Sequence, residues 1–313
     1  MKVSLGLPLW DPDLLDEFGS APALGEVARA GESAGFDACF TDDHPIPGND
    51  SFAFGSHHAF DPFVVLAIVA GATTTLRLHT NLVILPFRNP FLVAKSAASL
   101  DACSGGRLIL GAGAGYARTE FEALGVDFDE RNDLCDEAID VMKEVWSGAT
   151  VTRQGRHFDA PGNSARPLPV QRPHPPIWIG GNSKLAIRRA VDRADGWSPF
   201  PNPDAGAAER RSPVIDTVTA LRTRIEYAAE YAEQVGRTEP LEIVFMPLGS
   251  DGQKLDMWTQ DLPSASWVVD SAGQLRDAGV TYLAVTLPGQ TRRDLITQIE
   301  WFGSEVLPSV DQL

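Results

Sequence analysis

The chain alternates short apolar segments with longer amphipathic segments, and the alternation repeats eight times. The short segments are rich in β-branched and other apolar residues, whereas the longer ones carry apolar residues at helical spacing. We expect strands at residues 3–7, 36–41, 76–82, 108–112, 177–180, 196–199, 241–246 and 282–286. We expect helices at residues 23–34, 61–73, 90–103, 130–146, 184–194, 213–235, 266–278 and 292–306. Such alternation predicts an α/β fold with a parallel sheet, and eight repeats close a (β/α)8 TIM barrel.

A barrel of this kind is a single unit, so we expect residues 1–313 to form one domain. An open doubly wound sheet has the same alternation, but a dinucleotide-binding one carries a G-x-G-x-x-G turn after its first strand. Leu7-Pro8-Leu9-Trp10 stands there instead. Residues 150–176, which begin with a predicted hairpin at 151–158, and residues 250–264, a candidate lid, are longer than minimal connections. We expect these insertions to lie at the C-terminal face of the barrel, over its mouth.

Charge and hydropathy limit the partners of the chain. A formal net charge of −16 repels a phosphate backbone, so nucleic acid is not an expected partner. No apolar run approaches the roughly 20 residues of a membrane span, and the first residues resemble a strand rather than a signal peptide, so we expect a cytoplasmic location. Three distant cysteines and the adjacent pair His57-His58 match no metal-ligand spacing. We therefore expect no metal, and a small molecule as the substrate.

The second predicted strand ends in the ionisable residues Thr41-Asp42-Asp43-His44. Barrel active sites are built at the C-terminal ends of strands, so His44 is the leading catalytic candidate. An imidazole can donate a proton near neutral pH, and a neighbouring carboxylate can fix its tautomer. In the alternative interpretation, Asp42 and Asp43 cap a turn and His44 is an ordinary loop histidine.

Two glycine-rich turns follow predicted strands, at residues 111–116 and 180–183. Small residues let the backbone approach a ligand and present N–H groups to an anion, and a helix that begins after two glycines suits a phosphate. The alternatives are close packing at the first turn and an ordinary capped βα turn at the second. Arg88, after the third strand, is either near an anion, in an intersubunit ion pair, or a capping group.

The run from Leu100 to Tyr116, LDACSGGRLILGAGAGY, followed by EFEALG at residues 120–125, resembles the signature of the luciferase-like monooxygenase superfamily. Further matching motifs occur in the same order and spacing: DH at 43–44, LPFRNP at 85–90, PIWIGG at 176–181 and ADGW at 194–197. Together they cover most of residues 1–200, and the chain beyond about residue 205 is less diagnostic. Within the superfamily the likeness is to the coenzyme F420-dependent oxidoreductases of the mycobacterial type.

This resemblance implies a barrel that is usually a homodimer and holds coenzyme F420 in its mouth, with FMN as the alternative coenzyme. It implies that His44 is catalytic and that Asp43 contacts the coenzyme. It also implies a non-proline cis peptide between Asn81 and Leu82 against the coenzyme ring. Backbone groups implied to hold the coenzyme's phosphate are those of Ala114, Gly115, Gly180 and Gly181.

Two departures from the family bear on the identity of the substrate. Its sugar-phosphate dehydrogenases carry a glutamate base where this chain has Tyr116, and Thr119 replaces an asparagine that contacts the coenzyme. Glucose-6-phosphate is therefore disfavoured, and the aromatic loop residues Phe52, Phe54 and Phe60 fit a less polar substrate. We expect F420-dependent hydride transfer to or from a small organic substrate. The alternatives are an FMN-dependent monooxygenase and a coenzyme-binding protein without turnover.

Overall fold

The computed structural model describes residues 1–49, 57–202, 208, 211–248 and 264–313. Eight parallel strands form a closed barrel in the order β1-β10-β9-β8-β7-β4-β3-β2. The strands are β1 (Lys2–Gly6), β2 (Ala38–Thr41), β3 (Arg77–Ile84), β4 (Leu108–Gly113), β7 (Ile177–Gly180), β8 (Gly196–Ser198), β9 (Glu242–Phe245) and β10 (Tyr282–Val285). Every predicted strand is present within two residues of its expected bounds, so the predicted barrel is confirmed.

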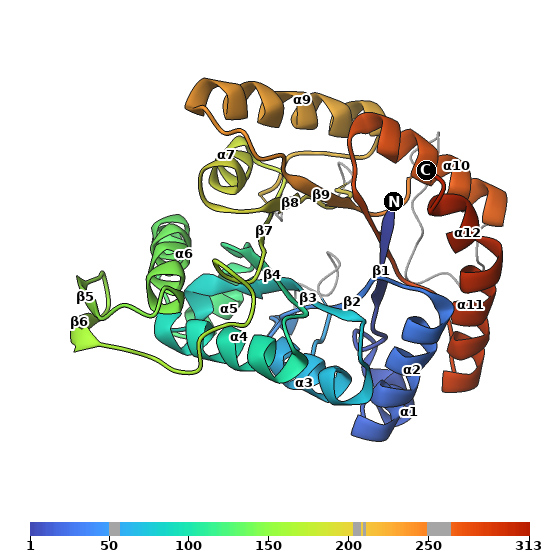
Figure 1. Ribbon diagram of the computed structural model, residues 1–313, viewed down its shortest axis with the longest axis horizontal. Coiled ribbons are helices and arrows are strands. Elements are labelled where there is room, and N and C mark those ends of the chain that lie inside the picture. The colour runs from blue at the N-terminus through green and yellow to red at the C-terminus, as the bar shows by residue number, and fades with distance from the viewer. Residues whose placement is uncertain (50–56, 203–207, 209–210, 249–263) are drawn as a thin grey trace.

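The main helices surround this barrel, as Figure 1 shows. They are α2 (Ala21–Ala34), α3 (Pro62–Ala72), α4 (Pro90–Ser104), α6 (Arg131–Trp146), α7 (Lys184–Arg193), α9 (Val218–Val235), α10 (Ala265–Ala278) and α11 (Arg292–Glu305). Shorter helices are α1 (Leu15–Phe18), α5 (Arg118–Ala123) and α12 (Leu307–Val310), with 3-10 turns at Pro12–Leu14, Leu85–Phe87 and Phe128–Glu130. The predicted helix at 213–235 begins only at Val218, because the Thr217 side chain accepts the Ala220 N–H and caps it there.

Two apolar layers hold the barrel together. The larger one lies between strands and helices, and the smaller one fills the barrel interior below the mouth. The interior cluster consists of Phe40, Ile109, Trp178, Val244, Tyr282 and Ala284. The N-terminal ammonium donates to the carbonyl of Val310 at 3.0 Å, so the two ends of the chain lie side by side (Figure 1). Among the described residues, no helix is both long enough and apolar enough to cross a membrane.

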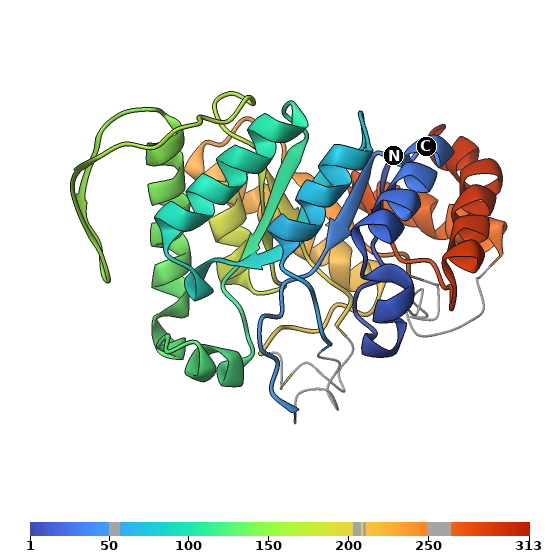
Figure 2. The ribbon, with the colours of Figure 1, turned by 90° about the horizontal axis from the view of Figure 1, so that it is seen from below.

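The insertion at 150–176 contains a hairpin that starts where predicted but extends beyond residue 158, and it does not cover the mouth. Its strands are β5 (Val151–Gln154) and β6 (Asp159–Asn163), and Figures 1 and 2 show them outside α6. The insertion follows a helix and precedes a strand, so it leaves from the N-terminal side of the barrel. Phe158 packs edge-on against Phe91 of α4, with ring centroids 5.0 Å apart. The predicted placement over the mouth is therefore wrong for this insertion.

The connections that reach the mouth include those that follow β2 and β4, of which residues 42–49, 57–61 and 114–130 are described. They contribute His44, His57 and Tyr116 to the cavity described below. The candidate lid at 250–264, except its last residue, lies outside the described residues, as do Phe52 and Phe54.

Candidate active site

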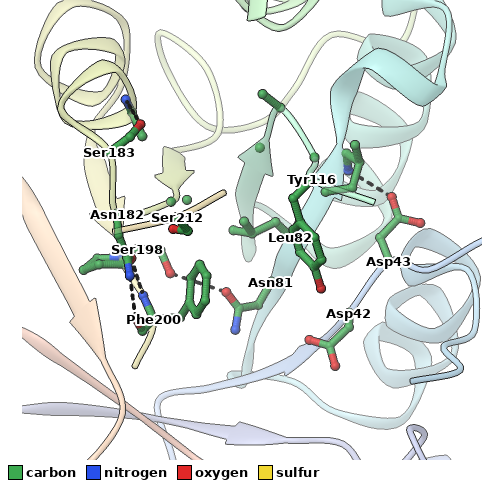
Figure 3. Close-up of a pocket in the computed structure, with 18 of the residues that line it drawn as sticks. Asp42, Asp43, Asn81, Leu82, Tyr116, Asn182, Ser183, Ser198, Phe200 and Ser212 are labelled. Atoms are coloured by element: carbon green, nitrogen blue, oxygen red, sulfur yellow. Dashed lines mark hydrogen bonds between the residues drawn. The ribbon is translucent and has the colours of Figure 1, made fainter. Parts of the chain in front are cut away.

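The C-terminal ends of the strands surround a cavity of about 540 Å³. All of the residues predicted to be catalytic or to bind a coenzyme line it: Asp43, His44, Asn81, Leu82, Ala114, Gly115, Gly180 and Gly181. Figure 3 shows Asp42, Asp43 and Tyr116 on one side of the cavity, with Asn182, Ser183 and Ser198 opposite. The fold thus brings together residues as distant in the sequence as Asp43 and Gly181, which are 138 positions apart.

His44 is held by a glutamate that the sequence analysis did not select. Its Nδ1 lies 3.0 Å from Oε2 of Glu120, in α5, and the other Glu120 oxygen accepts the Ile46 N–H at 3.3 Å. Glu120 is only 1% exposed. An ionised carboxylate can only accept, so the neutral His44 ring carries its proton on Nδ1 and leaves Nε2 for a ligand. Glu120 is 76 residues from His44, and no local pattern marks it as the partner.

A second histidine–carboxylate pair stands beside the first. His57 Nε2 lies 2.9 Å from Oδ2 of Asp42, and both residues line the cavity. The rings of His57 and His44 are edge-to-face with centroids 4.9 Å apart, and the Tyr116 ring lies 6.2 Å from that of His44. Two imidazoles, each paired with a carboxylate, therefore meet on one side of the cavity.

Asp43 is tied to the end of β3. Its Oδ2 accepts the Ile84 N–H at 2.9 Å, and both of its oxygens bond the Arg88 guanidinium, which also reaches Asp61 at 3.2 Å. Burial disfavours the charged guanidinium, but the Asp43 and Asp61 carboxylates outweigh it and raise the pKa of Arg88. In this chain Arg88 is thus neither a free anion-binding group nor in need of a second subunit. Asp43 therefore fixes the end of β3 in the wall of the cavity.

The Asn81–Leu82 peptide bond is cis, as the family resemblance implied, and the pairing of β3 with β4 shifts register between Thr80 and Val83. The Asn81 side chain lies 3.4 Å from the Ser198 hydroxyl of β8, a contact drawn in Figure 3. The Leu82 side chain occupies the space in front of Gly180, where an added Cβ would lie 2.0 Å from Leu82 Cδ1. Gly180 therefore has a packing role whether or not a phosphate binds there.

The neighbouring turn residues are also fixed. Gly115 has a φ of +78°, and a Cβ there would lie 2.8 Å from Ile84. The Trp197 indole donates to the Gly181 carbonyl at 2.8 Å. Ser183 caps α7 by accepting the Ala186 N–H at 3.1 Å. The backbone at both predicted phosphate turns is therefore rigidly placed, and the α7 N-terminus opens on the cavity.

Arginines gather where α6 and α7 begin. Arg131 and Arg211 both line the cavity and both stack on Phe128, with guanidinium carbons 4.0 and 5.2 Å from the ring centroid. Burial, together with the neighbouring Arg211, lowers the pKa of Arg131. Arg189 also lines the cavity but is paired with Asp136 at 2.6 Å. Within the described part of the chain no carboxylate forms an ion pair with Arg131 or Arg211, so this end of the cavity favours an anion.

Among the residues that the structure describes, no group of three or more histidine, cysteine, aspartate or glutamate side chains could hold a metal ion. His57 is paired with Asp42 inside the cavity, whereas His58 next to it is exposed.

Comparison with known proteins agrees with this geometry. The family model for luciferase-like monooxygenases matches residues 11–238. An uncharacterized protein of Mycobacterium tuberculosis is 31% identical over 308 residues, which cover 91% of this chain and 94% of the relative. An F420-dependent glucose-6-phosphate dehydrogenase of Amycolatopsis mediterranei is 23% identical over 95% of this chain and 97% of the relative. The oxygenase component of a flavin-dependent trigonelline monooxygenase of Acinetobacter baylyi is 34% identical over 44% of this chain and 40% of the relative.

A solved structure has the same fold. The monooxygenase RslO1 of Streptomyces bottropensis superposes with a TM-score of 0.77 at 20% identity, over 98% of this chain and 99% of its own. The family model covers more than half of the chain, and its members include both F420-dependent and flavin-dependent oxidoreductases. The chain therefore belongs to the luciferase-like monooxygenase family.

Proposed function

We propose that the protein is an oxidoreductase that binds coenzyme F420 in the barrel mouth and transfers hydride to or from a small organic substrate. The observation that carries the proposal is one cavity that is lined by His44, which the buried Glu120 holds, and by Arg131 and Arg211, which form no ion pair with a carboxylate among the described residues. The histidine–glutamate pair suits proton transfer beside the reactive ring of a coenzyme, and the arginines suit its anionic end.

The cavity fits such a coenzyme. Its volume of about 540 Å³ lies in the range of small-molecule sites. The proposed coenzyme-binding residues are Asp43, Asn81, Leu82, Ala114, Gly115, Gly180 and Gly181. Similarity to an F420-dependent enzyme extends over 95% of the chain, whereas the flavin-dependent relative aligns with 44% of it, which supports F420 first and FMN second.

In the proposed reaction the coenzyme supplies or accepts the hydride, and the protein handles the proton. His44 is the catalytic residue: its Nε2 donates a proton to, or accepts one from, the reacting atom of the substrate. Glu120 is a positioning residue that holds the ring through Nδ1 and stabilises its protonated form. Asp43 and Arg88 hold the end of β3 in place.

The substrate end of the cavity supports a molecule of low polarity. Trp10, Phe40, Val244, Met246 and Ala284 line it with apolar surface. Tyr116 offers a phenol where sugar-phosphate dehydrogenases of the family carry a carboxylate. Arg88 does not line the cavity and is paired with Asp43 and Asp61. We therefore propose an uncharged substrate with a carbonyl or hydroxyl oxygen, and not glucose-6-phosphate. We further propose that the enzyme is a cytoplasmic homodimer, which sedimentation equilibrium would test.

Titration of the purified protein with F420 and with FMN, followed by fluorescence, tests the coenzyme. We expect saturable F420 binding. Tight FMN binding without any response to F420 would contradict the proposal and favour an FMN-dependent monooxygenase, the second candidate, which the trigonelline relative supports. Binding of either coenzyme with no turnover of any substrate would instead identify a coenzyme-binding protein.

Arg131→Gln tests the anionic end separately. Loss of one charge-assisted hydrogen bond costs about 1.5–3 kcal/mol, so the coenzyme Kd should rise about tenfold to a hundredfold. The salt dependence of Kd should also become weaker. Arg153→Gln is the matched control, because Arg153 lies in β5, away from the cavity, in a surface pair with Glu144. Equal affinities for the two variants would show that the anion binds elsewhere.

A further inference from the structure

The two histidine–carboxylate pairs of the cavity differ in their access to solvent. The side chains of His44 and Glu120 are 10% and 2% exposed. Those of His57 and Asp42 are 14% and 24% exposed. Both pairs have hydrogen-bond geometry, at 3.0 and 2.9 Å, and their rings are in edge-to-face contact. The buried pair is therefore in direct contact with a second pair that is nearer to water.

The position of the buried pair creates a requirement for a proton route. Each hydride transferred from the coenzyme to a substrate consumes one proton, which His44 gives up from Nε2. The other ring proton stays on Nδ1 of His44, because it is donated to the Glu120 carboxylate, which can only accept. A coenzyme and a substrate in the cavity would cover what little of His44 is exposed. His44 must then regain its proton through a neighbouring group before the next turnover.

We propose that His57 and Asp42 form a proton-relay pair that exchanges protons between solvent and His44. The inference rests on the proposed function, since it assigns a second pair to the same reaction. The relay balances: a proton from water reaches His57, passes to Nε2 of His44 directly or over one water molecule, and from there reaches the substrate. Asp42 stabilises the protonated His57 ring, as Glu120 does for His44. In the oxidative direction the same steps run in reverse.

Other titratable groups around the two rings are less suited to this role. Among the described residues the Tyr116 ring also lies near His44, but at 6.2 Å between centroids it is farther away than the His57 ring at 4.9 Å. Asp43 and Asp61 are bonded to Arg88. Glu120 accepts from both His44 and Ile46. His57 is the neighbour that combines a titratable imidazole with contact to His44.

His57→Gln tests the relay, and His58→Gln is its matched control, because His58 is adjacent in sequence and exposed. With the coenzyme identified by the titration above, we expect His57→Gln to lower kcat at least tenfold with little change in KM. The first turnover of enzyme that starts with His44 protonated should keep its rate. Added imidazole should restore kcat, and Asp42→Asn should show a smaller loss of the same kind.

A measurement without turnover completes the test. In coenzyme-saturated protein without substrate, nitrogen-edited NMR of labelled histidines gives the exchange rate of the His44 ring protons with solvent. We expect this exchange to slow at least fivefold in His57→Gln and to be unchanged in His58→Gln. Unchanged exchange and kcat in His57→Gln would overturn the relay, as would slow exchange in Tyr116→Phe instead. Failure of the wild-type protein to bind either coenzyme would contradict the proposed function itself, a different result.

Discussion

Replacement of Glu120 by Gln tests whether this buried carboxylate determines the protonation of His44. One Glu120 oxygen accepts from Ile46 N–H at 3.3 Å and the other faces His44 Nδ1 at 3.0 Å. A Gln side chain has one oxygen and one NH₂ group, so its oxygen should stay with the Ile46 N–H, which can only donate. Its NH₂ group then faces Nδ1 and donates to it. The substitution should therefore move the His44 proton from Nδ1 to Nε2.

The expected effect on rate follows from the kind of hydrogen bond that is lost. A hydrogen bond to a charged group contributes about 1.5–3 kcal/mol and a neutral one about 0.5–1.5 kcal/mol. The Gln NH₂ group cannot accept from the protonated ring, so Glu120→Gln should remove the whole charge-assisted bond, about 1.5–3 kcal/mol, which is about a tenfold to hundredfold loss in the rate of proton-coupled hydride transfer. Stability should change little, because the side-chain volume and both hydrogen bonds are retained.

Two measurements check this prediction. Nitrogen NMR of the histidine rings identifies the His44 tautomer, and stopped-flow absorbance follows oxidation of the reduced coenzyme by substrate. Glu122→Gln serves as the control, because Glu122 is exposed on the same helix, α5. The reasoning is refuted if Glu120→Gln retains the Nδ1-protonated tautomer, or if its rate equals that of Glu122→Gln.

Three further predictions concern stability. Arg88→Leu leaves the Asp43 carboxylate buried, with 2% of its side chain exposed and no cation, and should lower the free energy of unfolding by about 3–5 kcal/mol, measured by urea denaturation. Gly180→Ala places a Cβ 2.0 Å from Leu82 and should cost about 1–3 kcal/mol and weaken coenzyme binding, measured by thermal melting and titration. Burial lowers the pKa of His79 to about 3, so between pH 6.5 and 3 the unfolded chain binds a proton that the folded chain does not, and stability falls as the pH falls. His79→Phe should reduce this fall between pH 6.5 and 4 by up to about 3 kcal/mol.

Each of these has a control in the chain. Arg88→Lys keeps one charge beside Asp43 and should lose less than Arg88→Leu; equal losses would show that the charge is unimportant. No atom lies within 4 Å of a Cβ added at Gly71 of α3, so Gly71→Ala should not destabilise the protein. His174→Phe is the control of the pH experiment, because His174, unlike the fully buried His79, is only partly buried. Parallel stability curves for wild type and His79→Phe would contradict the reasoning on His79.

The barrel itself was predictable because its signals are local. Strand and helix periods extend over a few turns, and left-handed glycines at Gly35, Gly105, Gly236 and Gly279 end four helices where the sequence places them. The hairpin does not lie over the mouth as predicted, because the insertion that contains it lies between a helix, α6, and the next strand, β7. An insertion between a helix and the next strand leaves from the N-terminal side of a barrel, and only connections from a strand to a helix reach the mouth.

The site was predictable only where residues stand next to a strand end. His44 and the two glycine turns directly follow β2, β4 and β7, so barrel geometry alone directs them to the mouth. Arg131 reaches the cavity from the start of α6, and Glu120 of α5 lies behind His44, its partner 76 positions away in the sequence. Nothing local distinguishes Glu120 from the exposed Glu122, because burial in α5 depends on how this short helix packs against the connection after β2, where Glu120 contacts His44 and Ile46.

The distribution of charge around the cavity favours one orientation of the proposed coenzyme. The chain carries a net charge of −16, yet the cavity contains two arginines without a carboxylate partner among the described residues, both beside the start of α6. Arg189 of α7 bonds the Asn132 carbonyl at 3.1 Å and so fixes the start of α6 against α7. The carboxylates Asp42 and Glu120, in contrast, stand with their histidines. An anionic tail at the carboxylate end would meet Asp42, so the proposed orientation places the tail between α6 and α7 and the reactive ring against His44. A coenzyme bound in the reverse orientation would separate its ring from both histidines, and neither Glu120→Gln nor His57→Gln would then affect turnover.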